Sequence, residues 1–184
     1  MDDLDKKDVE DFEKLAKTSK FKEIDVLYLH GGGKLSMDRF EDCIPALFKN
    51  TDTQIYIDSF NLDQEDIERI FRHCQKTRSL HIINCTVGDL ENLVIPEKES
   101  YRMTNLDLYW TAIDEDDKYI DADKFEELLK AIGNSKLSQS LKTIHVCEND
   151  FEAEAIEEII DDLDMKELEK LKIHADEKEP EVLN

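Results

Sequence analysis

Residues 67–87, "IERIFRHCQKTRSLHIINCTV", decide the fold of this chain. The first half repeats apolar residues at the spacing of one helix face, and the second half alternates apolar and polar residues as a half-buried strand does. In that strand Leu80 and Ile82 point to the same side, and Cys85 follows them. The stretch therefore predicts a helix that leads directly into a β-strand.

The strand half of this stretch recurs along the chain. Aligned segments begin at residues 27, 55, 80, 106, 144 and 171, and read "LYLHGGGKL", "IYIDSFNL", "LHIINCTV", "LDLYWTAI", "IHVCENDF" and "LKIHADEK". Four of them share one spacing of apolar residues, which are Ile55, Ile57, Leu62; Leu80, Ile82, Val87; Leu106, Leu108, Ile113; and Ile144, Val146, Phe151. The starts are 25 to 28 residues apart, except for one step of 38, and recurrence at such spacing indicates a repeat architecture.

Helical spacing separates most of these strands. We expect helices within residues 36–48, 63–74, 123–132 and 152–163, each with one apolar face. Pro45 predicts a kink in the first of them, since proline interrupts helical hydrogen bonding. The segment after Val87 is interrupted by Pro96, and we expect one short helical turn and a loop there.

The recurring template is L-x-L-x-x-N/C-x-L, and its N/C place holds Phe60, Cys85, Thr111 and Asn149. Over about residues 24–174 the chain resembles the leucine-rich repeat family, in the longer helix-containing form of ribonuclease inhibitor and the cysteine-containing repeats of F-box proteins. The resemblance implies an α/β solenoid with a curved parallel sheet on its concave side and helices on its convex side. One repeat cannot bury its apolar surface alone, whereas stacked repeats can.

The 184 residues are expected to form a single leucine-rich-repeat domain. Residues 1–20 include "DLDKKDVEDFEKLAKT", whose apolar side suits an N-terminal capping helix. About six degenerate repeats occupy residues 21–174, and residues 175–184 form an acidic tail.

The segment His30–Gly33, "HGGG", is similar to the loop that supplies an oxyanion-hole amide in lipase-type α/β-hydrolases. Such an enzyme also needs a G-x-S-x-G nucleophile elbow, and the nearest approach, "GNSKL" around Ser135, lacks the second glycine and follows a helical pattern. A phosphate-binding loop is also excluded, because Tyr28 and Leu35 stand where that motif needs Gly and Ser or Thr. We interpret the glycines as a widened turn between strand and helix.

The strongly acidic composition of the chain limits which classes of partner it can bind. Lys and Arg total 24 against 46 Asp and Glu, a formal net charge of -22, which disfavours nucleic acids and anionic membranes and is compatible with a basic protein partner. No apolar run reaches the about 20 residues of a membrane helix.

Cys43, Cys74, Cys85 and Cys147 form no CxxC pair, which indicates reduced, buried thiols. We expect a cytoplasmic monomer, with a nuclear location left open, and no cofactor.

The concave side is the predicted functional surface. Strand alternation places one row of residues there, Tyr28, Tyr56, His81, Asp107, His145 and Lys172, and a flanking row, His30, Asp58, Ile83, Tyr109, Cys147 and His174. From these rows the predicted partner-binding residues are Tyr28, Tyr56, Asp58, His81, Asp107, Tyr109 and His145. Tyrosine is enriched in protein recognition, although strands also favour aromatics without any binding role.

Two metal-binding alternatives carry little weight. His81, Asp107 and His145 fall on successive strands about 4.8 Å apart, so they could approach one ion, although a solvated row is the commoner outcome. Residues 114–124 are rich in carboxylates, yet Tyr119 and Phe125 stand where an EF-hand loop needs Gly and Glu. A solvated acidic loop followed by a helix cap at Asp121 or Asp123 is the simpler interpretation.

These patterns favour a non-enzymatic protein-protein interaction module, an adaptor or scaffold that uses the concave face and the acidic surface. The resemblance leaves open a regulatory or substrate-receptor subunit, as in a ubiquitin ligase, or a GTPase activator. No F-box-like segment is visible, and none of the five arginines stands in a motif of an activator.

Overall fold

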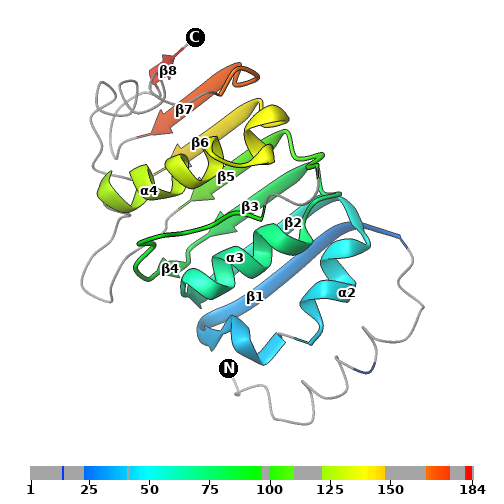
Figure 1. Ribbon diagram of the computed structural model, residues 1–184. Helices are drawn as coiled ribbons and strands as arrows, with labels where there is room; N and C mark the ends of the chain where they lie inside the picture. The colour runs from blue at the N-terminus through cyan, green and yellow to red at the C-terminus, as the bar shows by residue number, and fades with distance from the viewer. Residues whose placement is uncertain are drawn as a thin grey trace.

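The computed structural model describes residues 14, 23–40, 42–96, 100–109, 122–147, 165–174 and 181–183, which form an α/β fold around one sheet (Figure 1). The described strands run in the order β1-β2-β3-β5-β6-β7-β8, with the short β4 also beside β2. Their bounds are β1 Ile24–Ser36, β2 Thr51–Leu62, β3 Ser79–Ile83, β4 Thr86–Val87, β5 Asn105–Tyr109, β6 Thr143–Cys147, β7 Lys170–His174 and β8 Glu181–Leu183.

Strands β1 to β7 pair in parallel, and their register matches the repeat alignment. Leu27 lies opposite Ile55, which lies opposite Leu80, and the same row continues through Leu106 to Ile144 and Leu171. The predicted inward residues with described side chains are all buried: Leu27, Leu29, Ile55, Ile57, Leu80, Ile82, Leu106, Leu108, Ile144, Val146 and Leu171. The prediction of a parallel sheet with one apolar face is confirmed.

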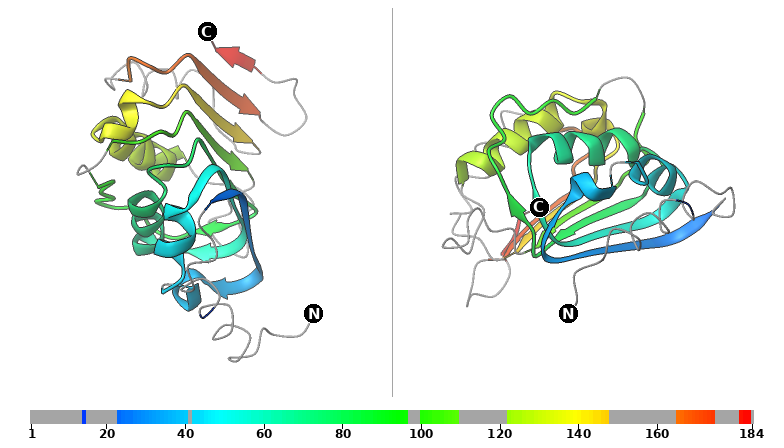
Figure 2. Two further views of the ribbon diagram at one scale, coloured as in Figure 1. Left: turned by 90° about the vertical axis from the view of Figure 1, so that its right-hand side faces the viewer. Right: turned by 90° about the horizontal axis from the view of Figure 1, so that it is seen from below.

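The described helices cover one face of this sheet, as the two side views show (Figure 2). They are η1 Met37–Phe40, α2 Ile44–Lys49, α3 Gln64–His73, α4 Ala122–Gly133 and η2 Lys136–Gln139, where η marks a 3-10 helix. In α3 the Asp63 carboxylate accepts a hydrogen bond from the Asp66 amide at 2.9 Å and closes a capping box, and Cys74 caps the other end. The apolar positions predicted for α3 and α4 are buried against the sheet.

The helix expected within residues 36–48 is divided, not kinked. The 3-10 helix η1 ends at Phe40, and α2 begins at Ile44, so that Pro45 lies in the first turn of α2. Proline is tolerated there because the first-turn amides of a helix have no intrahelical acceptor.

The glycine run is not the turn between strand and helix that we expected. It lies inside β1, where His30 pairs with Asp58 and pairing resumes only at Leu35 opposite Phe60. Five steps along β1 therefore span two steps along β2, so the run is a bulge within the strand. Gly32 and Gly33 adopt φ of 65° and 75°, a region that glycine enters without steric cost.

The same backbone link recurs where successive strands begin. The amide of Arg78 donates to Asp52 O at 3.2 Å, that of Thr104 to Arg78 O at 2.9 Å, and that of Lys142 to Thr104 O at 2.9 Å. The amide of Glu169 then donates to Lys142 O at 2.9 Å. Each strand is thus tied to the one before it in the same way, although the intervening segments differ in length.

Several expectations fall outside the described residues. These are the capping helix within residues 1–20, of which only Lys14 is described and is helical, the carboxylates of residues 114–121, and the helix within 152–163. In the predicted acidic tail, the described residues Glu181–Leu183 form β8, which pairs with β7 in antiparallel orientation. None of the described helices has the length and apolar character needed to span a membrane.

Candidate functional site

The candidate site is the open face, which we define as the side of the sheet opposite the helices (Figure 2). The register places three rows of residues across it, in the strand order β1, β2, β3, β5, β6, β7. Row one is Val26, Gln54, Ser79, Asn105, Thr143 and Lys170; row two is Tyr28, Tyr56, His81, Asp107, His145 and Lys172; row three is His30, Asp58, Ile83, Tyr109, Cys147 and His174.

All seven predicted binding residues occupy rows two and three of the open face, so the two rows expected from the sequence are confirmed as neighbours. Their accessibility differs widely. Tyr28 is 57% exposed and Tyr109 is 38% exposed, whereas Asp58 is only 6% exposed. Asp58 therefore organises its neighbours more than it offers a contact surface.

Row two begins with a ladder of rings. The ring centroids of Tyr28 and Tyr56 lie 5.7 Å apart at an interplanar angle of 34°. Tyr56 stacks on His81 with centroids 4.2 Å apart and an angle of 7°. Offset or tilted rings at such separations attract one another through their quadrupoles, so the three rings form one continuous surface across β1, β2 and β3.

Asp107 continues row two between two histidines. Its Oδ2 lies 2.7 Å from Nδ1 of His81, and its Oδ1 lies 3.8 Å from Nδ1 of His145. The Asp107 side chain is 26% exposed. On the far side of the His81 ring, Nε2 is buried and has no hydrogen-bond partner among the described residues. The carboxylate thus holds the His81 imidazole closely and lies farther from that of His145, and its side chain stays partly exposed.

Asp58 in row three gathers donors from β1, β2 and Asn84, the residue that follows β3. Oδ2 accepts a hydrogen bond from the Tyr28 hydroxyl and lies 3.1 Å from His30 Nδ1. Oδ1 accepts from Ser59 Oγ at 2.8 Å and from Asn84 Nδ2 at 3.1 Å. A buried carboxylate with this many donors is stable as the anion, and it holds the Tyr28 and His30 side chains in place.

The pKa values of this cluster follow from those hydrogen bonds. Burial raises the pKa of Asp58, but the hydrogen bonds from Tyr28, Ser59, Asn84 and His30 outweigh burial, and the pKa lies below its usual value. The hydrogen bond to Asp58 raises the pKa of Tyr28, with burial and the negative charge of Asp58 adding to it. Asp58 therefore remains charged and Tyr28 remains protonated at neutral pH.

Three members of the site were not predicted from the sequence. Val26 is 52% exposed on β1 next to Tyr28, and it extends the apolar end of the face. Ser59 and Asn84 adopt φ of 60° and 52°, which turns both side chains toward Asp58. Asn is among the residues that enter this left-handed region, and this preference is the one sequence signal that could have identified Asn84.

The metal-binding alternatives gain no support from the geometry. In the part of the chain that the structure describes, no group of three His, Cys, Asp or Glu side chains is arranged to hold a metal ion. Each histidine beside Asp107 instead directs Nδ1 toward the carboxylate. Asp123 lies inside α4, which begins at Ala122, so it is not the helix cap considered above.

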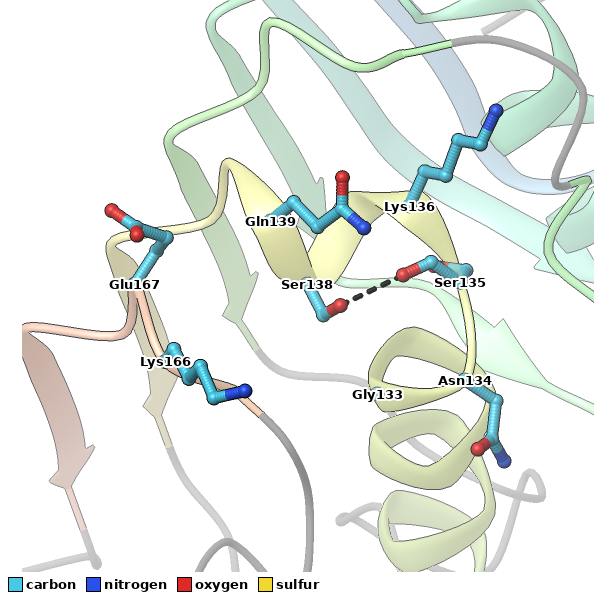
Figure 3. Close-up of a pocket in the computed structure, with 8 residues that line it drawn as sticks. All are labelled: Gly133, Asn134, Ser135, Lys136, Ser138, Gln139, Lys166 and Glu167. Atoms are coloured by element: carbon cyan, nitrogen blue, oxygen red, sulfur yellow. Dashed lines mark hydrogen bonds between the residues drawn. The ribbon is translucent and has the colours of Figure 1, made fainter.

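Nucleophilic catalysis at Ser135 is also unsupported. Ser135 caps η2: its hydroxyl donates to Ile132 O at 2.8 Å and accepts from the Leu137 amide at 3.1 Å. An open hollow of about 460 Å³ lies beside it, and there Ser138 donates to Ser135 O at 2.8 Å (Figure 3). His30 lies on β1, four strands away from β6, the strand that follows Ser135, so these two residues form no Ser-His pair.

Three cysteine thiols lie in the core. Cys43, Cys74 and Cys85 are buried, and none of the three is in a disulfide. Burial raises the pKa of Cys85 to about 12 and also raises that of Cys74, so neither forms the thiolate that nucleophilic chemistry requires. Cys85 Sγ instead lies within hydrogen-bonding distance of Ile83 O at 3.2 Å and of Ile57 O, on the preceding strand β2, at 3.5 Å.

Charge divides the open face into two parts. Its described acidic residues, Asp58 and Asp107, lie on β2 and β5, and its lysines, Lys170 and Lys172, both lie on β7. We call the part formed by β1, β2, β3 and β5 the aromatic half and the part formed by β6 and β7 the basic half. The aromatic half has no Lys or Arg at any position of the three rows.

Comparison with known proteins found no family, no curated protein and no solved structure that matches the chain.

Proposed function

We propose that this chain is a leucine-rich-repeat solenoid that acts as a non-enzymatic protein-protein interaction module, with the open face as its binding surface. The observation that carries the proposal is the pre-stacked ring ladder of Tyr28, Tyr56 and His81 on an open sheet face, with the Tyr28 ring exposed at its end. Tyrosine side chains supply large contact areas at low entropic cost, and they dominate many binding interfaces.

Two features support the repeat assignment. The parallel strands are joined by the recurring backbone links described above, and Cys85, at the template's N/C place, bonds to the strand of the preceding repeat. A rigid sheet of this kind fixes the side-chain positions before binding, which reduces the entropy lost when a partner docks.

The test is a pull-down from a lysate of the source cells, read by mass spectrometry. It compares the wild type with the variant Tyr56→Ala, His81→Ala, His145→Ala. We expect selective loss of at least one partner, because these side chains form the centre of row two.

A matched variant, Glu65→Ala, Lys76→Ala, Glu91→Ala, changes three exposed residues outside the open face and should retain every partner. Circular dichroism checks that both variants are folded. Partners that persist on the folded open-face variant would move the binding surface to another part of the chain and contradict the proposal.

A further inference from the structure

The aromatic half of the open face is equipped for cationic side chains of a partner. Tyr28 presents its ring with 57% of the residue exposed, and the adjacent Tyr56 ring extends the same surface. The faces of tyrosine rings carry partial negative charge and attract ammonium and guanidinium groups within about 6 Å. The ring ladder can thus receive a cation as well as apolar contacts.

No cation of the chain's own open-face rows competes for these rings. The lysines of the three rows are confined to β7, whereas the rings lie on β1, β2 and β3 at the other side of the sheet. In the three rows of the aromatic half Asp58 and Asp107 stand beside no Lys or Arg, and the whole chain carries a formal net charge of -22. This potential attracts a basic segment and repels an acidic one.

The two carboxylates differ in what they offer to such a segment. Asp58 is enclosed by its four donors and contributes only its charge. Asp107 is 26% exposed, and its Oδ1 is 3.8 Å from His145, too far for a good hydrogen bond. Asp107 can therefore accept a hydrogen bond from an incoming cation at the edge of the ring ladder.

We propose that the partner of this face is a basic protein segment that places an arginine over the Tyr28–Tyr56 rings and a second cation against Asp107. The inference deepens the proposed function and rests on it. Arginine fits better than lysine, because its planar guanidinium both stacks on aromatic rings and donates to a carboxylate in a fixed geometry. The lysines of β7 orient the segment, since they repel its positive charge from the basic half.

The test measures binding of the full chain to short fluorescent peptides by anisotropy at low and at physiological salt. The peptides share one length and spacing and carry Arg, Lys, Gln or Glu at the same positions. We expect the Arg peptide to bind most tightly, the Lys peptide more weakly, and the Gln and Glu peptides not to bind measurably. Affinity for the Arg peptide should fall with added salt, because exposed charges are screened.

Variants of the chain locate the contact. Tyr28→Ala should lower the affinity for the Arg peptide by about fivefold, because the cation–π contact is lost. Asp107→Asn should lower the affinity for the Arg peptide by about tenfold and make that affinity less dependent on salt. The matched control Lys172→Gln lies on the same row at the far edge, and it should leave the affinity unchanged or increase it.

Equal binding of Arg and Gln peptides, tighter binding of the Glu peptide, or no effect of Asp107→Asn would overturn this inference. Absence of binding by all four peptides would do so as well. None of these results would overturn the proposed function if the pull-down variant still loses its partner, since the partner's contacting segment would then be neutral or acidic. If the folded open-face variant instead keeps every partner in the pull-down, the proposed function fails, and the inference that rests on it fails too.

Discussion

The two halves of the open face share one backbone geometry and differ in how their side chains are used. In the aromatic half, ring stacking and the Asp58 cluster connect side chains of β1, β2 and β3. The basic half consists of Thr143, His145, Lys170 and Lys172, with Cys147 and His174 placed by register. A uniform parallel sheet can therefore carry two surfaces of opposite character, because each strand contributes its own residue to every row.

Among substitutions that distinguish the two halves, we expect the largest loss of stability from a change of Gly31, at the rim of the aromatic half. A Cβ at this position would lie 2.6 Å from Ser59 O and 2.7 Å from the Phe60 ring. Gly31→Ala should lower the free energy of unfolding by about 3 kcal/mol, because the backbone next to Asp58 must move. Urea unfolding followed by circular dichroism measures it.

Gly32→Ala is the matched control within the same bulge. Its Cβ would meet no atom within 4 Å, and only the φ of 65° is unfavourable, so we expect a cost of about 1 kcal/mol. Equal costs at both glycines would show that close packing of β1 on Ser59 does not stabilise the aromatic half.

The next largest effect on stability is expected to differ between the two carboxylates of the aromatic half. Asp58→Asn replaces a carboxylate that four donors surround by an amide, whose nitrogen can donate hydrogen bonds but cannot accept them. We expect the free energy of unfolding to fall by about 2 kcal/mol. Asp107→Asn changes a partly exposed group, and we expect about 1 kcal/mol or less. Chemical denaturation of both variants at neutral pH compares them, and a larger cost at Asp107 would reverse their assigned roles.

Acid should remove the stabilisation by Asp58. Its pKa is lowered in the folded state from the ordinary value of 3.8, so the stabilisation is fully present above about pH 4 and is lost as pH falls through the folded-state pKa. The difference in unfolding free energy between wild type and Asp58→Asn should therefore shrink below pH 4. Thr143→Val, which alters no titrating group, should differ from wild type by a constant amount over the same range. A difference for Asp58→Asn that stays constant down to pH 2 would contradict the cluster's role.

The smallest effects test the rows themselves. Tyr56→Leu removes stacking on both Tyr28 and His81, and it should cost about 1 kcal/mol of unfolding free energy. Lys172→Gln, on the same row in the basic half, should change stability by less than about 0.5 kcal/mol. Thermal unfolding of the two variants under identical conditions measures both, and equal values would show that the ring ladder adds binding surface without adding stability.

Much of this architecture could be predicted from the order of residues. The alternation in "LHIINCTV" and its repeats predicted which side chains are buried, and aligning the repeats predicted the row that contains Tyr56, His81 and Asp107. This works because strand alternation has a period of two residues, so repeats aligned on the apolar pair also align the polar residues between them.

Other features depend on contacts between distant segments. The sequence predicted a turn at the glycine run, because three glycines alone do not reveal that pairing with β2 resumes at Leu35. It also did not predict that Ser59 and Asn84 donate to Asp58, and the bond from Asn84 requires the end of β3 to lie beside β2.

By itself, then, the sequence determined the period, the buried face and the identity of each row, because these follow from local alternation and apolar spacing. Only the tertiary structure decided that Asp58 is an enclosed anion while Asp107 is accessible, and that the rings of Tyr28, Tyr56 and His81 stack into one surface. Burial and ring geometry are set by neighbours about 25 to 30 residues away along the chain, and no local pattern encodes them.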